Sequence, residues 1–447
     1  MNAQMYSRPT PIVTMADGTI KQVNPFSGTQ VWTVPGRANR PLTHLPADIH
    51  KLTYQDHVST CAFCSDRQIE TPPEKARMVQ SSVKKNSDWE ILRGVGAEDL
   101  YATTAAFRRV PNLFEIVSYD YWHDNYGYSL DSETQARMER YIASDLGRKH
   151  VLEIIKTKRK AAGNAVSTDY PENELLKDAS AFFGGGHDVI IARRHYTDDA
   201  THSDQLASAG TLTYEEHEAF IRFTIDSLRD LYSRNRYAPY VAVFQNWLKP
   251  AGASFDHLHK QLVAVDERGV HSEMEVQKLR QNPNMYNEWA VDFAAMHNLV
   301  IAENDHAICF AGFGHRFPTL EVFSKSAVSE PWLQSSEEIR DMSDLVHACH
   351  AGAGPQVPCN EEWHHKPVDV DIPMPWRIMI KWRVSTLAGF EGGTKIYLNT
   401  LSPWDVRDRI VHELYSLRDQ GRISPNIRIA TECAVQRNSL KYNVALH

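Results

Sequence analysis

The sequence has none of the long apolar runs that mark a membrane protein, and its charge is not that of a nucleic-acid binder. No stretch approaches the roughly 18 apolar residues that a membrane-spanning helix needs. Residues 1–18 place no apolar segment behind a basic one, so we expect no signal peptide. The formal net charge of −8 argues against general binding to nucleic acids or membrane surfaces, but it leaves room for a local basic pocket for a phosphorylated small molecule.

Cysteine is also scarce, which excludes a disulfide-stapled scaffold. The 447 residues include 6 cysteines, and only Cys61 and Cys64 lie close together in sequence. This usage is typical of a reducing compartment, and we expect a cytoplasmic protein. Hydrophobic residues make up 42% of the chain and charged residues 23%, as in ordinary soluble globular proteins, and the length indicates two to three domains.

The spacing of apolar residues predicts an α+β fold with a largely antiparallel sheet flanked by helices. Residues 1–60 hold short apolar runs broken by Pro and Gly, a pattern typical of strands and turns. Two segments have helical spacing, and the second opens with a capping-box pair, Thr213 and Glu216. The predicted helices cover residues 134–162 and 213–235, and the predicted strands lie around 189–191 and at 239–248 and 256–265.

Residues 180–265 are therefore predicted to run strand, helix, strand, strand. A similar order recurs later, with a strand at 316–325, a capped helix at 335–352 and a strand at 375–386. The two segments share this pattern but not their residues. The pattern is the basis for a hypothesis of internal duplication.

Cys61 and Cys64 have the spacing of a metal-binding turn. Two thiolates of a C-x-x-C turn can share one tetrahedral zinc ion, which then needs two more ligands from elsewhere. A buried pair of small residues and a redox dithiol are the alternatives, but no thioredoxin-like βαβ pattern surrounds the motif. The candidate suppliers of the further ligands are His187, His195, His202, His257 and His259.

A second motif alternates along the strand predicted at 256–265. Side chains two apart in a strand point to one face, so His257, His259 and Gln261 would line one surface. An exposed polar strand face is the alternative explanation of this pattern.

The segment around this motif resembles the active-site stretch of galactose-1-phosphate uridylyltransferases. Those enzymes are the transferase branch of the histidine-triad (HIT) superfamily, and their pattern is Phe-x-Asn, a small-residue turn, Ser and His-x-His-x-Gln. Here Phe244-Gln245-Asn246 precedes such a turn, and Ser254 and His257-Leu258-His259-Lys260-Gln261 follow it. Other segments match in the family's order: Asn24 to Gly28, Gly36 to Pro41, Cys61 to Glu74, Val110 to Phe114, Gly186 to His195 and Ala388 to Asn399.

The resemblance implies a role for each matching residue. The implied ligands of one structural zinc ion are Cys61, Cys64, His195 and His257. The implied catalytic residues are His259 as nucleophile, Gln261 as its phosphate-contacting partner and Ser254 as a hydrogen-bond donor to a phosphate oxygen. The implied nucleotide contacts are Arg37, Arg40, Asn112, Phe244 and Asn246, and the implied sugar contacts are Phe390 and Glu391.

The resemblance also implies two HIT-like lobes and a homodimer. Residues 1–265 would form the lobe with zinc and nucleophile, with a helical insertion at about 115–178. Residues 266–447 would form a second lobe that completes the sugar-phosphate side. The implied partners are a nucleotide sugar and a sugar phosphate or phosphate, with no nucleic acid and no membrane.

The implied reaction is exchange between UDP-glucose and galactose 1-phosphate through a nucleotidyl-histidine at His259. Gln261 stands where hydrolases of the superfamily have a third His, and a carboxamide cannot titrate to assist water. Transfer or phosphorolysis is therefore favoured over hydrolysis. The alternatives are a phosphorylase of nucleoside-diphosphate sugars or dinucleoside polyphosphates, and a noncatalytic protein that binds zinc and a nucleotide.

The sequence departs from the family pattern at two motifs. Ser65-Asp66-Arg67 follows the C-x-x-C where Pro-Gly-Asn is usual. Pro375-Trp376-Arg377 stands where some members have a His-x-His of a second metal site, which we therefore expect to be absent. Arg377 would meet either a phosphate or a carboxylate on the sheet.

Overall fold

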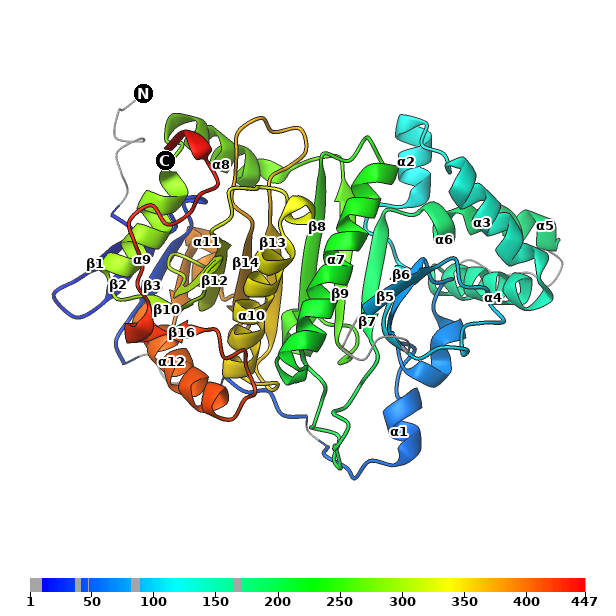
Figure 1. Ribbon diagram of the computed structural model, residues 1–447, viewed down its shortest axis with the longest axis horizontal. Helices are drawn as coiled ribbons and strands as arrows, with labels where there is room; N and C mark the ends of the chain where they lie inside the picture. Colours follow the sequence, from blue (N-terminus) through cyan, green and yellow to red (C-terminus); the bar gives the residue numbers. More distant parts are fainter. Residues whose placement is uncertain (1–9, 37–41, 47, 82–88, 164–170, 447) are drawn as a thin grey trace.

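A computed structural model describes residues 10–36, 42–46, 48–81, 89–163 and 171–446, and its centre is one continuous sheet of twelve strands (Figure 1). All neighbouring strands in this sheet pair antiparallel, which confirms the predicted α+β fold with an antiparallel sheet. In spatial order the strands are β16 (Arg428–Ile429), β10 (Val300–Glu303), β11 (Ala307–Ala311), β12 (Thr319–Ser324), β14 (Arg377–Trp382), β13 (Cys359–His364), β8 (Tyr240–Trp247), β9 (His259–Val265), β7 (His187–Ala192), β6 (Ala105–Pro111), β4 (Ala76–Gln80) and β5 (Trp89–Arg93).

Three long helices pack on one face of this sheet, and Figure 1 shows two of them, α7 and α10, side by side across its middle. The three are α7 (Tyr214–Arg234), α10 (Ser336–Ala353) and α12 (Pro403–Asp419). The capping box predicted at Thr213 and Glu216 is confirmed, and Ser335 caps α10 in the same way. Because strand residues alternate between faces, Leu262 of β9 lies in the helix-covered core, while its neighbour Gln261 points to the other face.

The same order of elements occurs twice, and in the second set the structure adds β13 to the predicted strand, helix and strand. The first set is β7, α7, β8 and β9, and the second is β12, α10, β13 and β14. In the sheet the two sets are arranged as β12-β14-β13 and β8-β9-β7, and they meet where β13 pairs with β8. The strand order of one half is therefore the reverse of the order in the other half, starting from this central pair of strands.

A small second sheet joins the two ends of the chain. It contains β1 (Ile12–Thr14), β2 (Ile20–Val23), β3 (Gln30–Thr33) and β15 (Ile396–Asn399). Strand β3 pairs with β15 in parallel, and this pairing holds residues 12–33 against the C-terminal half of the chain. The domain boundary at residue 265 stays a prediction, because the main sheet runs across it without a break.

The chain between β6 and β7 is helical, and the insertion predicted at about 115–178 falls within it. Its single predicted helix over 134–162 is two helices, because the backbone of Ser144 is extended (φ −81°, ψ 146°). The hydroxyl of Ser144 accepts a hydrogen bond from the amide of Gly147 at 3.0 Å and so caps the second helix. The helices of this insertion are α2 (Tyr119–Tyr126), α3 (Ser132–Ala143), α4 (Asp145–Ala161), α5 (Glu172–Leu175), the 3₁₀ turn η3 (Leu176–Ala179) and α6 (Ser180–Gly184).

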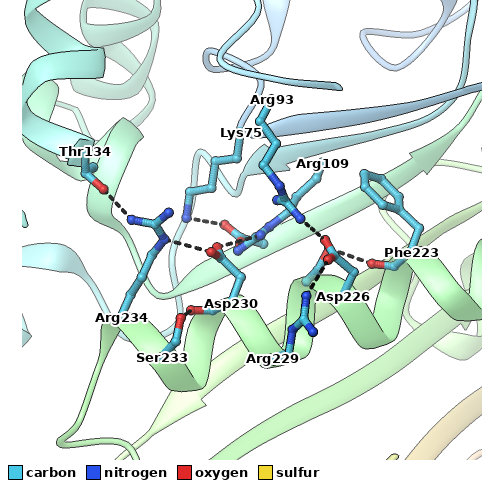
Figure 2. A network of polar contacts seen from close by, with 12 residues as sticks. Lys75, Arg93, Arg109, Thr134, Phe223, Asp226, Arg229, Asp230, Ser233 and Arg234 are labelled. Carbon is cyan, nitrogen blue, oxygen red and sulfur yellow. Dashed lines mark hydrogen bonds and ion pairs between the residues drawn. The ribbon is translucent and has the colours of Figure 1, made fainter. Parts of the chain in front are cut away.

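Charged side chains fix the insertion to the helix-covered face of the sheet (Figure 2). Arg234 of α7 donates to Asp131 and Thr134 at the start of α3, at 2.7 and 2.6 Å. Asp230, one turn earlier on α7, accepts from Arg234 at 2.9 Å and from Arg109 of β6 at 2.7 Å. The insertion, α7 and the sheet are thus joined by one network.

The remaining helical segments are short or lie at the edges. They are α1 (Tyr54–Ser59), η2 (Ser65–Glu70), η4 (Ala209–Thr211), η5 (Lys249–Ala251), α8 (Gly269–Gln281), η6 (Asn287–Val291), α9 (Asp292–Met296), η7 (Pro331–Leu333), α11 (Gly389–Thr394), η8 (Ala430–Glu432) and η9 (Val444–Leu446). Among the helices of the described ranges, none has the length and apolar character to cross a membrane.

Candidate active site and metal centre

The His-x-His-x-Gln motif lies where β9 begins. The strand starts at His259, three residues later than predicted, so His257 precedes it in a bend. His259 and Gln261 remain on one face of β9, as their spacing requires, while the ring of His257 turns toward the C-x-x-C turn. His257 points in another direction because it lies in the turn before the strand, and the alternation of side chains between faces begins only at His259.

Four donor atoms converge at this bend, from Cys61, Cys64, His195 and His257. They lie within 4.8 Å of one another, and among the described residues they are the only His, Cys, Asp or Glu group of this kind. The two sulfurs are 3.8 Å apart. The sulfur of Cys61 lies 3.5 Å from Nδ1 of both His195 and His257, and that of Cys64 lies 3.6 and 3.8 Å from the same two atoms.

These distances are the edges of a zinc tetrahedron. With Zn–S near about 2.3 Å and Zn–N near about 2.05 Å, tetrahedral angles place two sulfurs about 3.8 Å apart and a sulfur and a nitrogen about 3.6 Å apart. His257 also donates from Nε2 to the carbonyl of Ala192 at 2.6 Å, which leaves Nδ1 as its metal-binding atom. The hydrogen bond between the two thiols lowers the pKa of Cys64 and raises that of Cys61, so a single thiolate is favoured on Cys64. The four residues fit a zinc ion.

The structure separates the three histidines that were candidate ligands near β7. His195 joins the two cysteines, whereas His187 lies on β7 and contacts Gln261 instead. His202 forms an isolated bridge with Lys51 at the surface, away from the thiols. The ligand set that the resemblance implied is the set that comes together.

His259 is held with one ring nitrogen engaged and the other free. Its Nδ1 donates to the carbonyl of His257 at 2.6 Å, so the lone pair is on Nε2. No described residue forms a hydrogen bond with Nε2. Burial lowers the pKa of His259 to about 4, so the ring is neutral at physiological pH. A neutral imidazole with a free Nε2 can act as a nucleophile.

Gln261 is oriented by two neighbours. Its Oε1 accepts from Nε2 of His187 at 3.0 Å and from Nδ2 of Asn112 at 3.3 Å. The amide of Ile116 donates to Nδ1 of His187 at 3.1 Å, which places the ring proton on Nε2. With its oxygen held in this way, the NH₂ group of Gln261 is directed away from these partners and can donate to a phosphoryl oxygen.

Two more predicted residues lie on the neighbouring strand β8. Phe244 pairs with Gln261, and Asn246 lies two residues further along the same face. The side-chain oxygen of Asn246 accepts from Asn360 at 2.7 Å, which leaves its NH₂ group for a ligand. Ser254 is exposed in the turn before β9, so its hydroxyl is accessible.

The remaining predicted contacts are Arg37, Arg40, Phe390 and Glu391. Arg37 and Arg40 lie outside the described residues. Phe390 and Glu391 belong to α11 and line a cavity of about 510 Å³ beside β3 and β15. The carboxylate of Glu391 accepts from the amides of Ala388 and Leu398 at 2.8 and 3.2 Å, so it holds its own loop.

Sequence reasoning missed two features of the site. Phe63, inside the C-x-x-C turn, packs edge-on against His259 with ring centroids 5.2 Å apart. Asn360 orients Asn246 from β13, and no motif in the sequence marks it. Arg377 pairs with a carboxylate, but that carboxylate is Glu275 of helix α8 at 2.6 Å and not one on the sheet.

Known proteins share this fold over most of the chain. ADP-glucose phosphorylase of Arabidopsis thaliana is 22% identical over 287 residues, which cover 62% of this chain and 79% of that protein. A crystal structure of an ADP-glucose phosphorylase from that plant with bound ADP-glucose covers 88% of this chain and 98% of its own, with TM-score 0.55 and 18% identity. A GalT-like protein from Arabidopsis thaliana gives the same coverage, with TM-score 0.52 and 17% identity.

The predicted resemblance to GalT-like proteins is thereby confirmed for the fold. Residues 15–442 match the family described as a domain of unknown function, DUF4921, and the chain belongs to that family.

Proposed function

We propose that this protein is a nucleotidyltransferase that takes a nucleoside monophosphate from a nucleotide sugar through a covalent intermediate on His259. The observation that carries the proposal is the free Nε2 of a neutral, buried imidazole whose Nδ1 is tied to the carbonyl of His257. Nε2 attacks the α-phosphorus, the bond to the bridging oxygen breaks and a sugar 1-phosphate leaves. An oxygen of the second phosphate then attacks the same phosphorus and breaks the P–N bond.

The groups around His259 stabilise the charges that develop during this transfer. During attack the imidazole gains positive charge, and the carbonyl of His257 stabilises it through the Nδ1 hydrogen bond. Gln261 and Asn246 each keep an NH₂ group directed to the phosphoryl oxygens. Bound zinc would hold the bend before β9 through Cys61, Cys64, His195 and His257. Closed coordination by four residues makes its role structural.

UDP-glucose and galactose 1-phosphate are the substrates by the sequence resemblance, with a role in galactose metabolism. Phosphorolysis of a nucleoside-diphosphate sugar is the second candidate, favoured by the similarity to an ADP-glucose phosphorylase. The two differ only in the acceptor, a sugar phosphate or inorganic phosphate. We place either activity in the cytoplasm, in keeping with six unpaired cysteines.

Labelled nucleotide sugars test the proposal. Protein incubated with UDP-glucose or ADP-glucose, each labelled in the α-phosphate, should form an acid-labile, alkali-stable adduct that His259→Gly abolishes. Release of the label as a nucleotide sugar upon addition of galactose 1-phosphate identifies a transferase, and release as a nucleoside diphosphate upon addition of phosphate identifies a phosphorylase. Binding of nucleotide without any adduct would instead support a noncatalytic nucleotide-binding protein.

We further propose a homodimer that shares its sites. The cavity at Phe390 and Glu391 has no lining residue in common with the cavity at Asn246, so the two cavities are separate within one chain. A second copy that supplies Phe390 and Glu391 would complete the sugar end. Mixing inactive His259→Gly and Glu391→Ala chains under conditions that exchange subunits should then restore activity, whereas no recovery would argue for sites within single chains.

A further inference from the structure

The second half of the sheet repeats the strand register of the first, and this locates the counterpart of the nucleophile. In the first half Ile191, the fifth residue of β7, pairs with His259. In the second half Phe323, the fifth residue of β12, pairs with Arg377. Both His259 and Arg377 are the first residues of their strands. Arg377 therefore occupies the position in the second half that corresponds to the nucleophile His259 in the first half.

The equivalence extends to the other catalytic position. Gln261 pairs with Phe244 of β8, and at the same place in the second half Met379 pairs with Glu362 of β13. The second half thus has neither an imidazole nucleophile nor a carboxamide at these positions. Any ligand there would be bound without covalent chemistry.

A cavity of about 880 Å³, a size suited to a nucleotide-like ligand, extends from Phe244 and Asn246, the proposed nucleotide contacts, over this face of the second half. Five basic and two acidic residues line it, in a chain whose overall formal charge is −8. They are Arg268, Arg316, Arg377, Lys381 and Arg383, with Glu275 and Glu362. A basic cavity in an acidic protein favours an anionic ligand.

Three of the five basic residues already have carboxylate partners. Arg377 pairs with Glu275 at 2.6 Å, and Lys381 pairs with Glu362 at 2.5 Å. Arg268 pairs at 2.6 and 2.8 Å with two carboxylates outside the cavity lining, Glu273 and Asp369. The uncompensated charge is therefore that of the other two arginines.

Arg316 and Arg383 both pack against one aromatic ring, that of Phe317. Their guanidinium carbons are 4.8 and 4.7 Å from the ring centroid of Phe317. In both, the Nε atom is buried without a hydrogen-bond partner, and neither forms an ion pair with a carboxylate of the described chain. Burial and the charge of Arg316 lower the pKa of Arg383, as expected for neighbouring cations without an anion.

We infer that the part of this cavity in the C-terminal half is a second ligand site beyond the proposed nucleotide contacts, in which Arg316 and Arg383 bind a phosphate group of a phosphorylated small molecule. Guanidinium groups match phosphate oxygens in charge and geometry, and an anion would satisfy both buried Nε donors. Arg383 also donates to Asn360 at 2.7 Å, and Asn360 donates to Asn246 at 2.7 Å. This chain of hydrogen bonds links the second site to the proposed nucleotide contact.

Counting bound ligand tests this inference. We would titrate the wild-type chain, Arg316→Gln/Arg383→Gln and Arg148→Gln with ADP and with inorganic pyrophosphate by calorimetry. Arg148 is a matched control, because it carries the same charge on the exposed helix α4 and pairs there with Asp145. The double variant should lose one ligand equivalent per chain, or bind it at least about tenfold more weakly, while the control matches wild type.

The yield of covalent adduct separates this site from the proposed active site. Adduct should still form in the double variant, because the covalent step takes place at His259, which does not line this cavity. Loss of the hydrogen bond from Arg383 to Asn360, which holds Asn246, should lower the yield only in part. Unchanged stoichiometry and affinity would overturn the second site, and so would parallel loss of binding and adduct, which would assign both arginines to the active site. If wild type forms no adduct, nucleotidyl transfer fails while the ligand count still decides the second site.

Arg316→Gln alone keeps the test decisive if the double variant does not fold. Arg316 makes no hydrogen bond or ion pair with another described residue, so its replacement removes charge without breaking a polar pair, and the Gln side chain keeps part of the contact with the rings of Phe317 and Tyr397. Its thermal unfolding without ligand should match that of wild type, and one ligand equivalent should bind about tenfold more weakly. Equal affinity in a folded Arg316→Gln chain would contradict the inference.

Discussion

The imidazole of His187 fixes the orientation of the Gln261 side chain, with Nε2 of the ring 3.0 Å from Oε1 of the amide. The amide of Ile116 sets the tautomer by donating to the other ring nitrogen. Burial also lowers the pKa of His187, so the ring remains neutral and keeps a single donor for Gln261. His187 is thus a positioning residue for a group proposed to contact phosphate.

Replacing His187 by Ala should slow adduct formation by about 2- to 10-fold, because one lost orienting hydrogen bond costs about 0.5–1.5 kcal/mol. His187→Gln should recover much of the rate, because its carboxamide can donate to Oε1 from a similar place. Single-turnover labelling measures the rate, and metal content should stay at the wild-type level in both variants. Equal rates for Ala and Gln would show that His187 only fills space.

Substitutions of His257 and His259 should affect metal binding and covalent labelling separately. His257→Ala removes one of four ligands, so it should lower both the zinc content and the unfolding temperature. His259→Gly should keep one zinc per chain and lose all covalent labelling, because His259 is outside the cluster. Metal analysis of both purified variants is the measurement, and loss of zinc from His259→Gly would reverse the two roles.

Asp344 should make the protein less stable as pH rises. It is buried in α10, and burial raises its pKa from 3.8 to about 7. Between about pH 4 and pH 7 the unfolded chain has lost this proton while the folded chain retains it, so the free energy of unfolding falls across that window. Above pH 7 the full penalty, on the order of 4 kcal/mol, is present.

Asp344→Asn should therefore stabilise the protein at pH 8 and have little effect at pH 4. Denaturant unfolding of both chains at several pH values measures the difference. Exposed Asp145, replaced by Asn, serves as the control and should show no such trend. A stability gain independent of pH would mean that Asp344 does not change ionisation in this range.

Asp188 should be critical for the network of Figure 2. Its buried carboxylate accepts from Lys75 at 2.7 Å and Arg109 at 2.6 Å. Asp188→Asn leaves these buried cations short of one negative charge and should lower the free energy of unfolding by about 3–5 kcal/mol. Equilibrium unfolding checks the value, and a loss below about 1 kcal/mol would show that Asp230 alone balances the cations.

Much of the fold follows from local sequence signals. The capping boxes at Thr213 and Ser335 and the apolar spacing behind them define α7 and α10 within one or two residues. Predictions failed where a single residue interrupts a periodic pattern, as at Ser144, or where a turn precedes a strand, as at His257. At Ser144 a capping hydrogen bond starts a new helix, and at His257 the ring turns to the cysteines, so local contacts determine the structure at both positions.

The sequence by itself determined the chemistry that is present: a C-x-x-C turn, a His-x-His-x-Gln strand and the repeated order of elements. Only the tertiary structure decided which histidine joins the thiols, that Arg377 meets a carboxylate, and that Arg316 and Arg383 face one ring. The reason is physical. Spacing along the chain fixes which side chains share a face, whereas strand order and register fix which distant residues meet.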